Sequence, residues 1–209
     1  MWLALIGPPG SCKQAVADRI AKDMGFVVER ETLPTEALAA FEQSPSKEAF
    51  GLQLDWMIRR WRLQRNIQRR GAEEDVVQVR TFWDTEHIFT EVLYFRGYIG
   101  DKEHEHLRLV YNALSETLTP PHIVIYLRSS SHIAENRISV SGKKSLHEED
   151  SRQIVEMYEA YAKKIRVSVV EVDVVEDFEL MISEVKAAIE GVRASGMMNQ
   201  SIWSRGFLK

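Results

Sequence analysis

A glycine-rich stretch near the start of the chain has the residue types and spacing of a phosphate-binding loop. It runs from Gly7 to Gln14, between an apolar segment at 2–6 and a segment with the spacing of an amphipathic helix. A strand that turns sharply into a helix points successive backbone N–H groups at one place, where the helix dipole also favours an anion. Lys13 would add a positive charge for the outer phosphates of a bound molecule.

This loop departs from the motif G-x-x-x-x-G-K-[ST] at two positions. Gly7 and Lys13 match, but Cys12 replaces the second glycine and Gln14 replaces the hydroxyl residue that binds magnesium. The alternative is an ordinary strand–turn–helix corner. The loop directly follows the first predicted strand, and the helix after it keeps one apolar face until Gly25. This position favours a phosphate site.

Other polar residues follow later predicted strands. Glu29 ends a short apolar run at 26–28, which predicts a buried parallel strand, and the segment 80–84 follows the strand at 76–79. Because ligands of open parallel sheets bind at the carboxyl ends of the strands, these residues are candidates for the same site as the loop. A long helix is predicted over 47–70, and we expect its arginines to form a solvated or partner-facing surface.

The order of the elements predicts a doubly wound, three-layer α/β fold. Strands are expected near residues 2, 26, 76, 123 and 167, separated by helices, which implies a five-stranded parallel sheet. One domain is expected over residues 1–194. The polar segment 141–149 is a candidate lid, and 195–209 a tail docked on a neighbouring surface.

Composition narrows the classes of partner. The 209 residues are 44% hydrophobic and 28% charged, with a net charge of -4, which argues against nucleic acid as the main ligand. A small molecule fits better. No apolar run is long enough to cross a membrane, so no membrane association is expected. The single cysteine, Cys12, suits a reducing compartment, and the first strand begins too early to leave room for a signal peptide, so we expect a cytoplasmic protein.

Five stretches in order carry a resemblance to a known family: residues 7–13, 50–53, 80–84, 120–128 and 134–138. Together they resemble the deoxynucleoside kinase family, whose members use a phosphate-binding loop to phosphorylate the 5′-hydroxyl of deoxynucleosides with ATP. The resemblance spans nearly the whole chain, and the order and spacing of the stretches are more specific than the loop alone. It implies ATP and Mg²⁺ as cofactors.

The resemblance also implies roles for individual residues. Glu29 is similar to the family's carboxylate that takes the proton of the 5′-hydroxyl, with Glu31 as the alternative, and Arg80 to its catalytic arginine. The substrate-binding candidates are Gln53, which would read the base, the possible stackers Trp56 and Phe82, and Asp84. The ATP-binding candidates are Gly7, Gly10, Ser11, Cys12, Lys13, Gln14, and Arg137 and Lys143 in the lid region.

Departures from the family pattern leave two functions open. Val79 stands where the family has an acid before its arginine, so both protein ligands to magnesium, here and at Gln14, are replaced and no metal-binding residue is predicted. The chain is either an active deoxynucleoside kinase or a catalytically impaired member that serves as a nucleotide-binding structural or regulatory subunit. The resemblance further implies a homodimer that pairs through helices between residues 50 and 118, or a subunit of a larger assembly in the second case.

Overall fold

A computed structural model describes residues 1–70, 73–130, 151–195 and Phe207. These residues form two compact units. The sheet unit comprises 1–29, 71–80 and 119–209, and the helical unit comprises 30–70 and 81–118. The candidate lid at 141–149, with Arg137 and Lys143, lies outside the described residues.

The sheet unit contains five parallel strands, as predicted. They are β1 (Trp2–Ile6), β2 (Val27–Glu29), β3 (Val76–Val79), β4 (Ile123–Arg128) and β5 (Ser168–Asp173). The strand order is β2-β3-β1-β4-β5, so β1 lies at the centre and pairs with β3 and β4. The loop that follows β1 therefore leaves the middle of the sheet.

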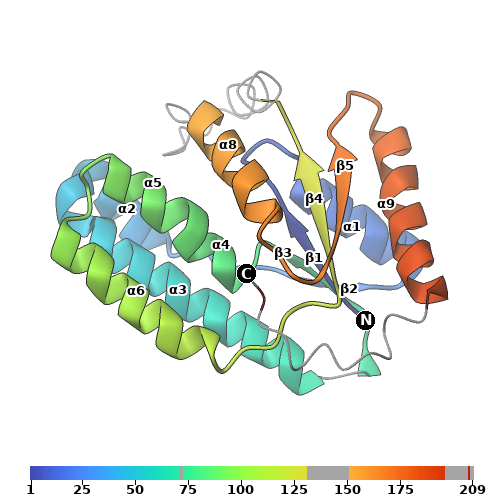
Figure 1. The fold of residues 1–209 in the computed structure, drawn as a ribbon, viewed down its shortest axis with the longest axis horizontal. Helices are drawn as coiled ribbons and strands as arrows, with labels where there is room; N and C mark the ends of the chain where they lie inside the picture. The colour runs from blue at the N-terminus through green and yellow to red at the C-terminus, as the bar shows by residue number, and fades with distance from the viewer. Residues whose placement is uncertain (71–72, 131–150, 196–206, 208–209) are drawn as a thin grey trace. The chain divides into compact units, whose positions relative to one another are not determined.

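Helices cover both faces of this sheet. α1 (Lys13–Met24) and α9 (Phe178–Ala194) lie side by side on one face (Figure 1), where their apolar residues pack against Leu3, Leu5 and Ile125. α8 (Ser151–Ala162) covers the other face, since its Tyr158 stacks on Tyr126, which points the opposite way from Ile125 along β4. The predicted three-layer α/β architecture is confirmed.

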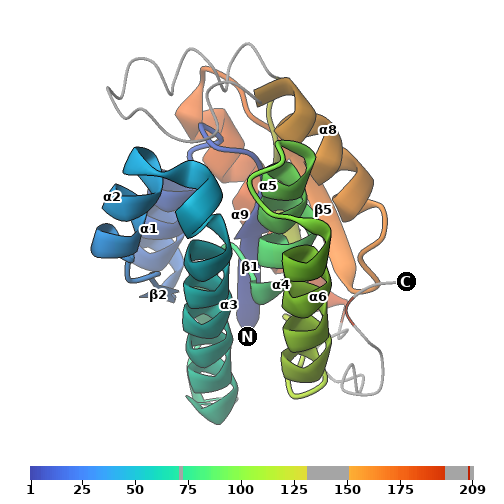
Figure 2. The ribbon, with the colours of Figure 1, turned by 90° about the vertical axis from the view of Figure 1, so that its left-hand side faces the viewer.

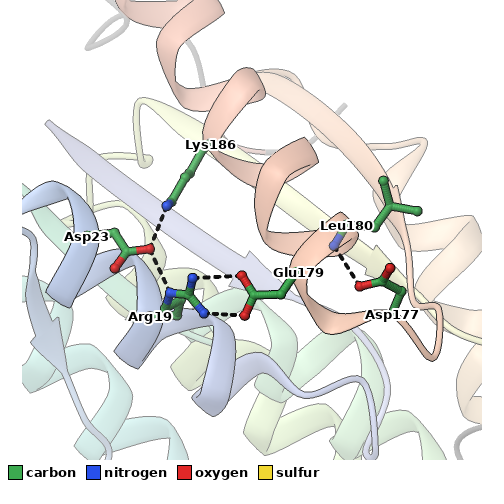
Figure 3. Close-up of polar contacts among 6 residues, drawn as sticks. All are labelled: Arg19, Asp23, Asp177, Glu179, Leu180 and Lys186. Carbon is green, nitrogen blue, oxygen red and sulfur yellow. Dashed lines mark hydrogen bonds and ion pairs between the residues drawn. The ribbon is translucent and has the colours of Figure 1, made fainter.

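An ion-pair cluster joins α1 to α9 at the surface (Figure 3). Arg19 donates two hydrogen bonds to Glu179, at 2.6 and 2.7 Å, and one to Asp23 on its own helix. Lys186 of α9 donates to the same Asp23 at 2.5 Å. Asp177 accepts from the backbone N–H of Leu180 and caps the start of α9. The two helices are thus held by charges as well as by the core beneath them.

The strand at β2 differs from the prediction of a buried strand. Val27 is 40% exposed, because β2 is an edge strand of the sheet and pairs with β3 alone. Phe207 is buried and its carbonyl oxygen accepts from the backbone N–H of Arg166, so this residue docks on the sheet unit.

The helical unit is built on two long helices that run in the same direction (Figure 2). α3 (Pro45–Arg70) and α6 (Asp101–Ser115) lie side by side (Figure 2). The remaining elements are α2 (Thr35–Gln43), the short α4 (Phe82–Asp84), the π-helix η2 (Thr85–Thr90) and α5 (Glu91–Phe95). No helix among the described residues is both long and apolar enough to cross a membrane.

The buried face of α3 corrects the prediction for one of its arginines, Arg60. Arg60 is only 3% exposed and lies on the face that also buries Gln53, Met57 and Gln64. These positions are spaced by three, four or seven residues, which is the spacing of one helix face. Arg60 therefore belongs to the interior of the helical unit, not to a solvated surface.

Candidate active-site residues

Gly7 starts the loop in a conformation that requires glycine. Its φ is 145°, and a Cβ at this position would lie 2.6 Å from the carbonyl oxygen of Leu127 and 2.9 Å from Ser11 Oγ. Gly10 also has a positive φ, of 80°. The turn that the motif predicts is therefore present, and it depends on glycine at both positions.

Lys13 places a positive charge inside this turn. Its ammonium donates to Gly7 O at 2.8 Å, Pro8 O at 2.6 Å and Ser11 Oγ at 2.9 Å, and the residue is 6% exposed. Lys13 is also the first residue of α1, whose dipole adds positive potential at the same end. A buried ammonium at a helix N-terminus fits the phosphates of a nucleotide, so the donor set suits ATP.

Cys12 has a left-handed backbone conformation, which is why the motif has a glycine at this position. It is the N-cap of α1 with φ 57° and ψ 18°, in the left-handed region. A side chain there costs roughly 1–2 kcal/mol relative to the right-handed region. The loop thus keeps the expected geometry despite the substitution.

Arg80 follows β3, which neighbours β1, and Glu29 ends β2, which neighbours β3. Arg80 comes directly after β3, and its backbone N–H donates to Leu5 O at 2.9 Å. It is half-buried and, like Cys12, has a left-handed φ, of 63°. Glu29 is the last residue of β2, half-buried, and pairs in register with Gln78 of β3. The sheet therefore brings the predicted base and arginine to the same edge as the loop.

At the two positions where the family's magnesium ligands are replaced, the side chains carry neither a hydroxyl nor a carboxylate. Gln14 is exposed and its amide nitrogen lies 3.4 Å from Asp18. Val79 is half-buried and packs against the hydrophobic core. Neither side chain replaces the lost hydroxyl or carboxylate, so a magnesium ion would depend on nucleotide oxygens and water.

The predicted base-reading residue lies in the helical unit. Gln53 is 4% exposed, and its Oε1 accepts from Thr90 Oγ1 at 3.5 Å. Trp56, one turn further along α3, is half-buried, and its ring lies 5.0 Å below the guanidinium carbon of Arg60. The structure brings these two predicted substrate-binding residues to adjacent turns of one helix.

Phe82 and Asp84 have structural roles in the same unit. The Phe82 ring is fully buried and stacks on Tyr111 at a centroid distance of 5.2 Å. Asp84 is also fully buried, and its Oδ2 accepts from the backbone N–H and the hydroxyl of Thr81 in a capping box. Neither side chain is exposed, so their contact with a substrate stays a prediction.

Arg60 is the residue that the sequence reasoning missed. It forms an ion pair with Glu31, donates to Thr85 Oγ1 at 2.9 Å, and lies over the rings of Trp56 and Phe89. A guanidinium held this way presents a fixed charge and a planar set of donors. The signal in the sequence was its spacing, because Arg60 follows Gln53 by seven residues and so lies on the same helix face. Glu31, the alternative base, is the partner of this arginine.

A parallel sheet whose central strand runs into a turn built on Gly7 and Lys13 defines the class of phosphate-binding-loop proteins. Within this class the chain belongs to the deoxynucleoside kinase family, whose sequence model matches residues 3–194. The prediction of a deoxynucleoside kinase, which is a phosphotransferase, is confirmed at the level of the family.

Individual relatives are distant but similar over most of their length. "Deoxyguanosine kinase" of Bacillus subtilis is 20% identical, covering 98% of this chain and 93% of the relative. "Deoxyadenosine kinase" of Dictyostelium discoideum is 22% identical, over 98% and 85%. Deoxyadenosine kinase from M. mycoides with bound dATP has a TM-score of 0.76 at 23% identity, covering 91% of this chain and all of that one. The same enzyme with the products dCMP and dCDP bound has a TM-score of 0.80 at 21% identity.

Proposed function

We propose that this protein transfers the γ-phosphoryl group of ATP to the 5′-hydroxyl of a deoxynucleoside. The observation that carries the proposal is the loop after β1, where a turn that admits only glycine at position 7 encloses the ammonium of Lys13 at the start of α1. Membership of the deoxynucleoside kinase family supports the acceptor. The nucleotide-bound relatives support the class of ligand.

The residues of the sheet unit act on the reacting groups. Lys13 and the loop hold the phosphates, and Glu29 takes the proton of the attacking hydroxyl. Arg80 stabilises charge on the transferred phosphoryl group. Phosphoryl transfer depends mainly on orientation and charge stabilisation, which these groups supply. Bound Mg²⁺ would neutralise phosphate charge. It would be held mainly by nucleotide oxygens and water, because Gln14 and Val79 carry neither a hydroxyl nor a carboxylate.

Residues of the helical unit select the nucleoside. The amide of Gln53 offers one acceptor and two donors to the edge of a base. Trp56 supplies a ring face for stacking, and Arg60 a buried charge beside it. Arg137 and Lys143 are proposed to contact ATP from the segment that includes the candidate lid.

The test is transfer of labelled phosphate from ATP to each of the four common deoxynucleosides. We expect activity in the parent. Replacement of Glu29 by glutamine should lower kcat by about 100-fold or more, because the general base is lost. Gln53→Leu should raise the KM for the deoxynucleoside by about tenfold, with the KM for ATP unchanged. Gln68→Leu, on the same helix, is the matched control and should match the parent.

A catalytically impaired subunit would give a different result. In that case no deoxynucleoside would be phosphorylated, even where calorimetry shows that ATP binds. Activity that survives Glu29→Gln unchanged would instead assign the base to another residue.

We propose in addition that the protein acts in the cytoplasm as a homodimer. The reducing conditions of that compartment suit its one cysteine, Cys12. The helical unit exposes Phe95 and Leu109 by 64% and 60%, which supports pairing through this unit. Localisation with a fluorescent tag tests the compartment, and sedimentation tests the dimer.

A further inference from the structure

Three side chains of types that can bind a metal converge in the helical unit from three different elements. They are Glu86 of η2, Glu91 at the start of α5 and His104 of α6. One ligand atom of each lies within 4.8 Å of the other two, and His104 Nε2 is 2.7 Å from Glu91 Oε1. All three residues lie within one unit and include none of the residues assigned to the reaction above.

Glu86, a member of this cluster, has a buried carboxylate oxygen that lacks a hydrogen bond. The residue is 4% exposed, and its Oε2 is buried with no hydrogen-bond partner in the described part of the chain. A buried carboxylate oxygen without a partner is costly. The positive charge of Arg108 acts on Glu86 from a distance but leaves this oxygen without a hydrogen bond. A cation bound between Glu86, Glu91 and His104 would satisfy it.

The π-helix explains how Glu86 and Glu91 come together. Residues five apart lie about 140° apart around an α-helix and so point away from each other. η2 spans Thr85–Thr90, and its wider turn brings the five-residue spacing onto one side. π-helical turns of this kind occur often at functional sites, where they re-aim a side chain.

The imidazole of His104 is also held in place by a contact on the face of its ring. Its ring stacks on Tyr94 at a centroid distance of 4.2 Å and an interplanar angle of 14°. The Tyr94 hydroxyl donates to Asp101 Oδ1 at 2.9 Å. The His104 side chain is 17% exposed and that of Glu91 29%, so an ion has access from solvent.

The ligand set selects a class of metal. One imidazole nitrogen with two carboxylate oxygens suits Zn²⁺ and similar transition metals, whereas Mg²⁺ and Ca²⁺ prefer oxygen alone. Two carboxylates balance the charge of a divalent ion. Metal–ligand bonds of about 2.0–2.1 Å place the ligand atoms of a tetrahedral site about 3.3 Å apart. The ligand atoms here lie within 4.8 Å of one another, so small side-chain rotations would bring them to bonding distance of the ion.

From these contacts we propose that Glu86, Glu91 and His104 bind a divalent transition-metal ion. A water molecule completes the coordination. The ion ties η2, α5 and α6 together, and this site is separate from the magnesium that accompanies ATP. The proposal does not depend on the phosphotransferase activity.

To test the proposal, the 209-residue protein is first treated with a chelator, which is then removed. Zn²⁺ is titrated into the metal-free protein. Calorimetry should give one tight site per chain, and Co²⁺ in place of Zn²⁺ should give a visible absorption band of a four-coordinate ion. Glu86→Gln and His104→Gln should each weaken Zn²⁺ binding by at least tenfold. His106→Gln, exposed on the same helix, is the matched control and should bind as the parent does.

Melting temperatures give a second measure of Zn²⁺ binding. This measure does not depend on catalytic activity, and it shows whether each variant is folded. Zn²⁺ should raise the melting temperature of the parent and of His106→Gln but not of His104→Gln. If Glu86→Gln does not fold in the presence of chelator, the more exposed Glu91→Gln takes its place. A parent that binds no Zn²⁺, or a His104→Gln variant that binds it with the affinity of the parent, would overturn the proposal.

Discussion

Arg80 combines a predicted catalytic side chain with a strained backbone. Its φ of 63° lies in the left-handed region, where residues other than glycine are uncommon. The position directly after β3 and the hydrogen bond from its N–H to Leu5 O hold this conformation. Strain that persists at a candidate active site is consistent with selection for the side chain over stability.

Replacement of Arg80 by glycine and by alanine separates the effect of its side chain on catalysis from the effect of its backbone strain on stability. Both variants lose the guanidinium, so both should lose phosphoryl transfer to a similar extent. Arg80→Gly should be more stable than Arg80→Ala by about 1 kcal/mol, because only glycine adopts a positive φ at little cost. Urea unfolding measures the difference. Equal stabilities would mean that the backbone relaxes when the side chain is removed.

Two arginine–carboxylate pairs that join elements differ in burial. Arg60 of α3 pairs with Glu31, and their side chains are 3% and 12% exposed. Arg19 of α1 pairs with Glu179 of α9, and these are 30% and 68% exposed (Figure 3). Hydrogen bonds from Arg19 hold the pKa of Glu179 below its usual value, but solvent screening leaves such a pair little effect on stability.

Removal of one charge from each pair should therefore have unequal effects. Glu31→Gln leaves a buried guanidinium without its counter-charge and should lower the free energy of unfolding by about 3 kcal/mol. Glu179→Gln should lower it by less than about 1 kcal/mol. Both are measured by urea unfolding at pH 7. Similar losses for the two variants would contradict the assignment of Arg60 to the interior.

Across the whole molecule, the proposed dimer makes a prediction about the surface of the helical unit. Leu109 is 60% exposed on α6, whereas Leu180, at 51%, is on α9 of the sheet unit. If the helical unit forms the interface, Leu109→Lys should weaken self-association by at least tenfold, because a lysine charge would be desolvated there. Leu180→Lys is the control and should sediment as the parent does. A parent that is monomeric at micromolar concentration contradicts the dimer.

The sequence by itself determined the α/β class, the five strands and the loop at Gly7. These depend on local patterns, since apolar runs, helical spacing and turn residues act within a few positions of the chain. It also led to the family, through short stretches in a fixed order. Gln53 and Trp56 were found as substrate candidates in this way.

Only the tertiary structure decided which polar residues are buried and which meet across elements. It made β2 an edge strand with Val27 exposed, and it turned Arg60 inward towards Glu31. It also brought Glu86 and His104 together, eighteen residues apart in the sequence, through a π-helix that no local pattern indicated. The physical reason is that strand order, burial and side-chain partners depend on packing between segments distant in sequence, which local periodicity does not encode.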